Sequence, residues 1–111
     1  MDRDRAAHLL EEERIRLEEL LRETDHAEED DRAGANAAGD MSDPAESLTA
    51  EEQEDAIAIG LRARLAMVKR AEDRLRDGTY GRSVLSGDPI PDERLEADPA
   101  AELTVEEAAR R

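Results

Sequence analysis

Residues 77–107 read DGTYGRSVLSGDPIPDERLEADPAAELTVEE, and this segment separates two kinds of structure. Before it the apolar residues follow a helical period. Within it, short apolar pieces alternate with Gly-Asp-Pro and Pro-Asp, which is typical of a loop-rich module. Ser83 and Ser86 stand three residues apart just before a glycine, as in a metal knuckle, yet the chain contains no cysteine. The segment therefore raises the question of what holds a knuckle together without metal ligands.

Polar residues in this module predict its local structure. Thr104 and Glu107 fit the capping box Ser/Thr-x-x-Glu, which predicts a short C-terminal helix starting at Val105. The hydroxyls of Ser83 and Ser86 are expected to bond the backbone of their own turn. A small apolar core is expected from six residues: Val84, Leu85, Ile90, Leu95, Leu103 and Val105.

Two long helices are predicted before the module. Residues 2–31 contain no glycine or proline, and a narrow apolar stripe with helical spacing runs through them. Its members are Leu10, Leu17, Leu20, Leu21 and Thr24. A second helix is predicted over about residues 44–76. Its apolar ladder is Leu61, Leu65, Val68 and Leu75, with Ala58 and Ala71 in register.

The ends of these helices are marked by turn and capping residues. Asp43 as N-cap and Pro44 at the first helical position are a start signal, and Thr49 opens a second candidate start. Gly78 is a stop signal, because glycine readily adopts the left-handed conformation. Residues 32–42, RAGANAAGDMS, predict a turn or tip.

We therefore expect a mainly α protein, since two helices of similar length joined by a short turn pack antiparallel. The predicted parts are a long two-helix coiled-coil hairpin over residues 1–77, with its tip at about 32–45, and the small module over residues 78–111. His8 and His26 lie eighteen residues apart on the first helix and are expected at the surface.

Composition limits the function. The chain has 111 residues, aromatic residues make up 1%, and 31 acidic residues face 16 basic ones, for a net charge of −15. Such acidity argues against binding to nucleic acid or to an anionic membrane surface. The sequence starts without the apolar region of a signal peptide, so a cytoplasmic protein is expected. Disorder competes with long helix as an interpretation of this composition.

Four motifs in the module together resemble the C-terminal part of the DksA/TraR family. They are Gly78-Thr79-Tyr80-Gly81, Ser86-Gly87, Ile90-Pro91 and Arg94-Leu95-Glu96-Ala97-x-Pro99-x-Ala101. The family pattern continues into a C4 zinc finger, and its spacing is kept, with seventeen residues between Ser86 and Thr104. The resemblance covers about residues 39–107 in detail.

The resemblance implies that the four cysteine positions of the family are occupied here by Ser83, Ser86, Thr104 and Glu107. Serine and threonine hydroxyls stay protonated at neutral pH and are poor zinc ligands, and Glu107 would stand alone. A zinc-finger-like module without metal is therefore expected, and no cofactor is predicted. The positions of the second cysteine pair form the capping box instead.

A second match lies at the predicted tip. The family carries the pattern Asp-x-x-Asp-x-Ala there, and Asp40, Asp43 and Ala45 fill it. Members of the family bind bacterial RNA polymerase, and their coiled coil enters the secondary channel so that the tip acids approach the catalytic centre. The resemblance implies the same contacts for these three residues. On local grounds alone, Asp43 is equally well explained as a helix N-cap.

The predicted function is accordingly a monomeric transcription regulator that binds RNA polymerase, without direct contact with nucleic acid. The alternative is a degenerate relative that binds another partner, or binds polymerase without modulating its active centre. An enzyme is not expected, because the chain offers no paired nucleophile and base. Some relatives respond to an alarmone, guanosine tetraphosphate, but no residues for that response are identifiable in this chain.

Overall fold

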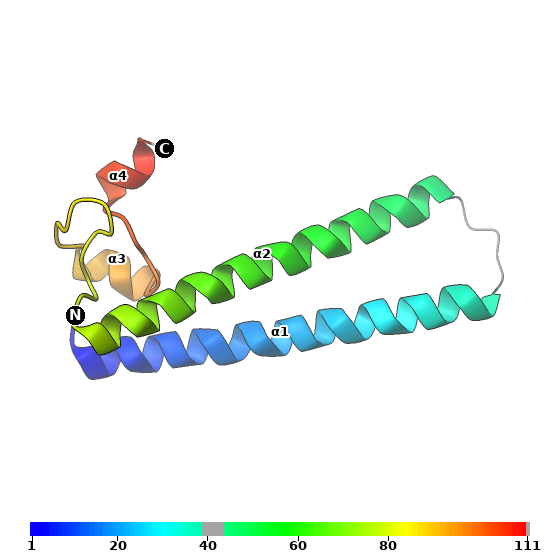
Figure 1. Ribbon diagram of the computed structural model, residues 1–111, viewed down its shortest axis with the longest axis horizontal. Coiled ribbons are helices and arrows are strands. Elements are labelled where there is room, and N and C mark those ends of the chain that lie inside the picture. Colours follow the sequence, from blue (N-terminus) through cyan, green and yellow to red (C-terminus); the bar gives the residue numbers. More distant parts are fainter. Residues whose placement is uncertain (39–43, 111) are drawn as a thin grey trace. The chain divides into compact units, whose positions relative to one another are not determined.

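The computed structural model describes the backbone of residues 1–38 and 44–110, and the side chains of residues 1–24 and 52–110. This part of the chain is mainly helical, as predicted (Figure 1). Two long helices come first, followed by two short ones. Their bounds are Arg3–Ala38 for α1, Pro44–Asp77 for α2, Asp92–Ala97 for α3 and Val105–Ala109 for α4.

Helix α1 continues beyond its predicted end. Residues 32–38 were expected to belong to the turn, but their backbone is helical. A glycine inside a helix costs only about 1 kcal/mol relative to alanine, and four alanines accompany Gly34 in this segment. The strong helix formers therefore outweigh Gly34 and Asn36.

Helix α2 begins and ends where the sequence predicts. It starts at Pro44, whose fixed φ and missing amide hydrogen suit the first turn of a helix. It ends at Asp77, and Gly78 follows with a φ of 85°. The amide of Thr79 then donates to the carbonyl of Arg74 at 2.9 Å. A Schellman motif has two hydrogen bonds, and this is the one that spans more residues along the chain.

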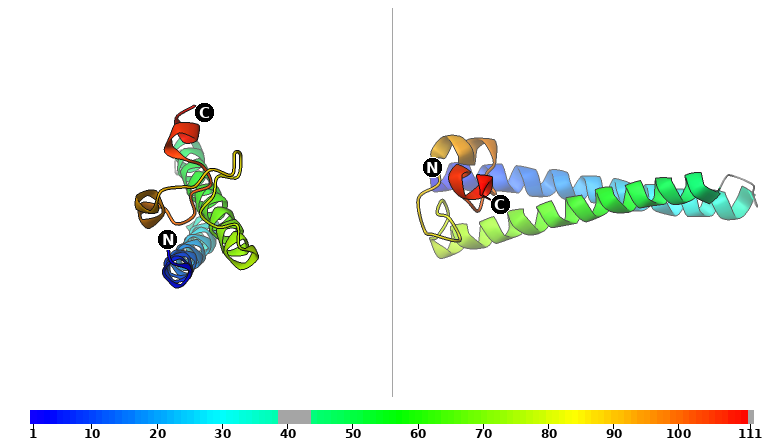
Figure 2. Two further views of the ribbon diagram at one scale, coloured as in Figure 1. Left: turned by 90° about the vertical axis from the view of Figure 1, so that its left-hand side faces the viewer. Right: turned by 90° about the horizontal axis from the view of Figure 1, so that it is seen from above.

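The chain divides into two compact units, Met1–Ile15 with Leu65–Arg111, and Arg16–Arg64. The first, here called the base unit, contains the N-terminal part of α1 and the C-terminal part of α2 together with α3 and α4 (Figure 2). The division into segments 1–77 and 78–111 stays a prediction, and within the base unit the C-terminal module packs with the helix ends.

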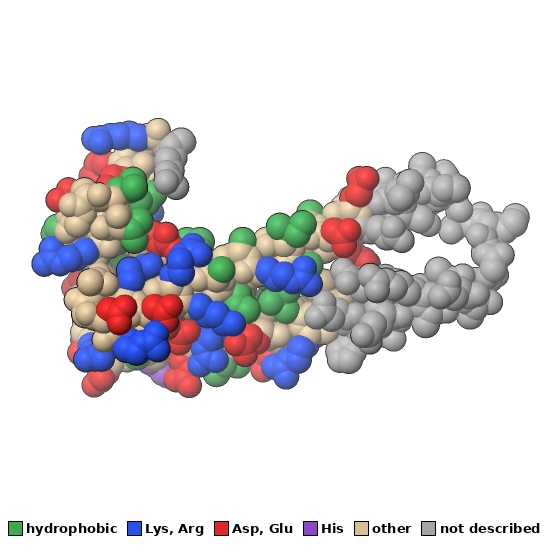
Figure 3. All heavy atoms as spheres, viewed as in Figure 1, with side chains coloured by type: hydrophobic (Ala, Val, Ile, Leu, Met, Phe, Trp, Pro, Cys, Tyr) green, Lys and Arg blue, Asp and Glu red, His purple; other side chains and the backbone are tan. Residues whose placement is uncertain are grey.

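Within the base unit, α1 and α2 run antiparallel (Figure 1), and each contributes residues to a small apolar core. Ala6 and Leu10 of α1 and Val68 and Ala71 of α2 are fully buried. An ion pair between Arg14 and Glu72, 3.2 Å apart, links the same two helices at the edge of this core. Acidic and basic side chains alternate over the visible face of the unit (Figure 3). Charged residues outside a narrow apolar stripe are expected to face solvent in this way.

In the second unit, Leu17 and Ala58 are buried, as the predicted stripe and ladder require. Leu20 departs from the prediction, because 40% of its surface is exposed. The apolar stripe predicted from helical spacing is wider than the surface that a single neighbouring helix covers, so a residue at its margin stays exposed. The extended coiled coil along both units remains a prediction. Within the described residues, no helix has the length and apolarity needed to cross a bilayer.

Candidate functional site

The C-terminal module of the base unit is built around one small apolar cluster. Ile90, Leu95 and Ala101 are buried there, and Met1 and Tyr80 pack against them. The hydroxyl of Tyr80 donates to the carbonyl of Pro99 at 2.8 Å. Burial raises the pKa of Tyr80 to about 12. The single aromatic residue of the chain is therefore a neutral core residue with a satisfied polar end.

The predicted core of the module is corrected at three positions. Val84, Leu85 and Val105 are at least half exposed, whereas Ile90 and Leu95 are buried as expected. The reason lies in the knuckle turn, because the side chain of Ser83 is turned inward and is only 5% exposed. The apolar side chains that follow Ser83 therefore face solvent.

The knuckle turn, residues 81–90, is closed by backbone hydrogen bonds. The amide of Ser83 donates to Asp88 at 2.8 Å, and the amide of Ile90 donates to Gly81 at the same distance. Gly81 and Gly87 have φ values of 88° and 78°, a region that residues with a Cβ rarely adopt. Glycine at both ends allows the chain to reverse and carry Ser83 inward.

The hydroxyl of Ser83 organises this turn. Its oxygen accepts from the amides of Leu85 and Ser86, at 3.1 and 3.2 Å, which confirms the expected role of this serine. Ser86 likewise accepts from the amide of Asp88 at 3.2 Å. The Ser83 hydroxyl in turn donates to Oε2 of Glu107 at 2.9 Å. The last bond joins residues 24 apart and was not foreseen.

Glu107 also closes the capping box at the start of α4. Its Oε1 accepts from the amide of Thr104 at 2.9 Å, and its own amide donates to the Thr104 hydroxyl at 3.2 Å. The predicted helix start is therefore confirmed in both of its bonds. One carboxylate thus joins the turn around Ser83 to the first turn of α4.

The same contacts hold Glu107 ionised. The pKa of Glu107 is lowered to about 2. The hydrogen bond from the amide of Thr104 lowers this pKa most, and the hydrogen bond from the hydroxyl of Ser83 has the second largest effect. The hydroxyls of Thr104 and Ser86 make smaller contributions. Hydrogen bonds to the charged form of a carboxylate favour that form. Hydrogen bonds therefore join three of the four positions of the resemblance, Ser83, Thr104 and Glu107.

These residues do not fit a zinc ion. Zinc is held in structural sites by thiolate, imidazole and carboxylate groups, and three of the four positions carry hydroxyls. Both oxygens of Glu107 already accept hydrogen bonds. Within the described part of the chain, no group of three or more His, Asp or Glu residues is placed to hold a metal.

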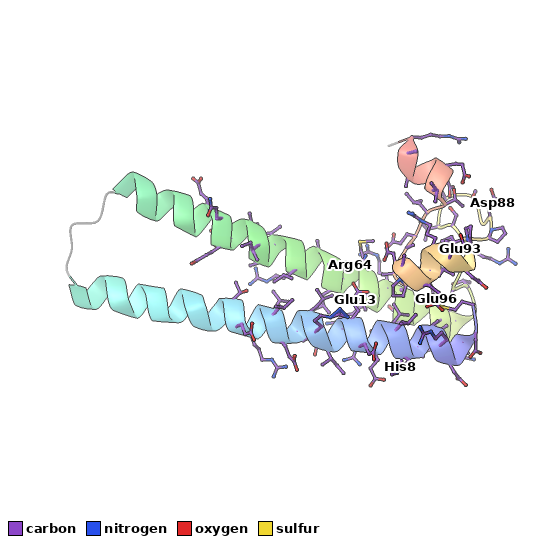
Figure 4. The ribbon with its side chains drawn as sticks, turned by 180° about the vertical axis from the view of Figure 1, so that it is seen from behind. His8, Glu13, Arg64, Asp88, Glu93 and Glu96 are labelled. Atoms are coloured by element: carbon purple, nitrogen blue, oxygen red, sulfur yellow. The ribbon has the colours of Figure 1, made fainter. Side chains whose placement is uncertain are left out.

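The module is tied to the long helices of the base unit by charged contacts. Glu102 lies 2.8 Å from Arg70 of α2, and its backbone carbonyl accepts from Val84 of the knuckle turn. Glu96 of α3, which is labelled in Figure 4, accepts two hydrogen bonds from Arg5 of α1. These pairs could not be predicted from the sequence, because charged residues occur throughout the chain.

The predicted tip residues belong to a part of the chain whose side chains the structure does not describe. Asp40 and Asp43 lie outside the described residues, and so do the side chains of Ala45 and His26. His8 is confirmed as a surface residue that pairs with Glu12 at 3.0 Å (Figure 4). The bounds of α1 and α2 still place Asp40 and Asp43 in the segment that connects the two long helices.

An open pocket of about 300 Å³ lies between α1 and α2 in the base unit. Arg3, Glu11, Arg14, Glu72 and Arg76 line it together with Ala7 and Leu75. Arg14 and Glu72 pair with each other, and Arg76 pairs with Asp73. The charges around this pocket therefore largely neutralise one another.

Known proteins resemble this chain in sequence or in structure. No family model matches the chain. General stress protein 16O of Bacillus subtilis (strain 168) is 51% identical over 45 residues, which cover 40% of this chain and 28% of that protein. The structure of transcription factor DksA2 from Pseudomonas aeruginosa matches with a TM-score of 0.50 and 26% identity, over 91% of this chain and 81% of that one.

The chain therefore has a DksA-like fold. The structural match covers almost the whole chain, whereas the curated relative shares only a segment that amounts to little more than a quarter of its own length.

Proposed function

We propose that this protein is a transcription regulator that binds bacterial RNA polymerase through the secondary channel. The observation that carries the proposal is the DksA-like fold, because the matching structure is that of a transcription factor. The motifs of residues 78–101 support it independently, since they resemble the module of a polymerase-binding family. The role is one of binding, and no catalysis by this chain is proposed.

In this proposal Asp40 and Asp43 act near the active centre of the polymerase, and Ala45 allows close approach. Support comes from their place in the chain, because α1 ends at Ala38 and α2 begins at Pro44. The active centre of a polymerase contains magnesium ions, so two carboxylates brought close to it would change the local field. An effect on the stability of the open promoter complex follows from that change.

The test combines binding with transcription. We expect the double variant Asp40→Asn with Asp43→Asn to be retained by core polymerase like the wild type, yet to lose its effect on transcription from a responsive promoter. The matched control is Glu52→Gln with Asp55→Asn, which removes the same charge from two exposed positions of α2. This control should keep both properties.

The outcomes separate the proposal from its alternative. An unchanged transcriptional effect in the tip variant would rule out the tip mechanism. Retention of the wild type by polymerase with no effect on transcription would identify a degenerate relative that binds without modulating the active centre. Failure of the wild type to bind would overturn the proposal as a whole.

A further inference from the structure

We propose that the carboxylate of Glu107 is the structural centre of the C-terminal module, in the place where the family pattern has a metal ion. In this proposal a single anion, held by hydrogen-bond donors from two segments, replaces a cation held by four ligands. The inference concerns the folding of the module and does not depend on the proposed function.

The first argument is the use of both carboxylate oxygens. Oε2 accepts from the hydroxyl of Ser83 and Oε1 accepts from the amide of Thr104, each at 2.9 Å. Hydrogen bonds to an ionised group are roughly twice as strong as bonds between neutral groups. Two such bonds to one side chain connect segments that the chain separates by about twenty residues.

The second argument is the burial of the groups around the carboxylate. Ser83 is 5% exposed and Thr104 is 8% exposed, so their hydroxyls are largely withdrawn from water. A buried polar group without a partner costs about 1–3 kcal/mol. Glu107 supplies the acceptor for Ser83, and Ser83 then supplies the acceptor for the amides of Leu85 and Ser86.

This arrangement goes beyond a capping box. A capping box requires only Thr104 and Glu107, and glutamine can replace glutamate in it. Here the carboxylate also fixes the Ser83 hydroxyl, and through it the knuckle turn. The turn is therefore expected to depend on the charge of a residue in α4.

The main test is hydrogen exchange of single backbone amides in the full chain. In Glu107→Gln we expect the amides of Leu85 and Ser86 to exchange about tenfold faster than in the wild type, because a charge-assisted bond to Ser83 is lost. The matched control is Glu106→Gln, an exposed neighbour in the same helix, for which no change is expected. Equal exchange in the two variants would overturn the proposal.

A double-mutant cycle covers the case in which Glu107→Gln unfolds the whole module. The melting temperature is measured for Ser83→Ala, Glu107→Gln and their combination. Residues that bond each other are expected to show non-additive losses, so the double variant should lose less than the sum of the two single variants. Additive losses would mean that Glu107 acts only on α4.

The last experiment tests whether zinc binds to the folded protein. The wild type is melted with zinc chloride and with a chelator, in separate samples. We expect the same melting temperature in both, because binding of a metal to the folded state alone would raise it. A rise with zinc that is lost in Glu107→Gln but kept in Glu106→Gln would show a metal at Glu107 and would contradict an anion at the centre.

Discussion

Ser83 and Glu107 form a link between two segments of the module with ordinary polar side chains. The serine hydroxyl donates once and accepts twice, so all of its hydrogen-bonding capacity is used inside the module. The glutamate accepts on both oxygens. Since the Ser83 hydroxyl is left without an unmet hydrogen bond, the burial of this serine is compatible with a stable fold.

The depressed pKa of Glu107 makes a prediction at this scale. Its pKa is lowered from 4.5 to about 2 in the folded protein, so the folded state binds fewer protons than the unfolded state between these values. The stabilisation by Glu107 is complete above about pH 4.5 and is lost as the pH falls to about 2.

The measurement is the melting temperature of the wild type and of Glu107→Gln over this acidic range. The advantage of the wild type should shrink steadily as the pH falls, because its carboxylate becomes protonated while the amide of the variant does not titrate. Other acidic residues affect both proteins alike and cancel in the difference. A difference that does not depend on pH would contradict the assigned contacts.

Leu95 and Leu85 make a second prediction, because they lie in the same module with opposite exposure. Leu95 is 1% exposed and Leu85 is 62% exposed. Leu95→Ala should lower the free energy of unfolding by about 2–5 kcal/mol, through lost burial and the cavity that remains. Leu85→Ala should change it by less than about 0.5 kcal/mol. Chemical denaturation of both variants tests this, and similar losses would reverse the assignment of the core.

At the scale of elements, two glycines should respond to the same substitution in opposite directions. Gly60 lies inside α2, and an added Cβ would meet nothing within 4 Å. Gly60→Ala should therefore stabilise the protein by about 0.5–1 kcal/mol. Gly78 ends α2 with a φ of 85°, where alanine is strained, so Gly78→Ala should destabilise it by about 1–2 kcal/mol. Thermal melting of both variants separates these effects, and a stabilising Gly78→Ala would contradict the helix end.

The sequence predicts those elements best whose signals are local. Thr104 and Glu107 mark the start of α4, and Gly78 marks the end of α2, because each signal consists of a few residues whose bonding is complete within one turn. The predicted end of α1 before Gly34 is wrong, because the small cost of a glycine to helix stability is outweighed by the alanines beside it.

Hydrophobic periodicity and capping motifs do not predict the hydrogen bonds that join distant segments of the module. Ser83 was expected to bond its own turn, and Glu107 was expected to cap its own helix, and both do so. Their bond to each other depends on how the chain returns after α3. The spacing of the resemblance was the one signal that placed these positions together.

At the scale of the whole molecule, the functional claim joins two features that lie far apart in the chain. The module resembles that of polymerase-binding proteins, and the acids Asp40 and Asp43 follow α1 and precede α2 in the sequence. The net charge of −15 favours a basic protein surface over nucleic acid as the partner. A regulator that reaches polymerase without contacting DNA fits these features together.

The central claim is tested most directly by competition for core RNA polymerase. Purified protein is bound to the polymerase, and an established secondary-channel protein is then added in increasing amounts. Two proteins that need the same channel exclude each other, so we expect full displacement of this protein. Stable binding of both proteins to one polymerase, or no binding of this protein at all, would contradict the proposed function.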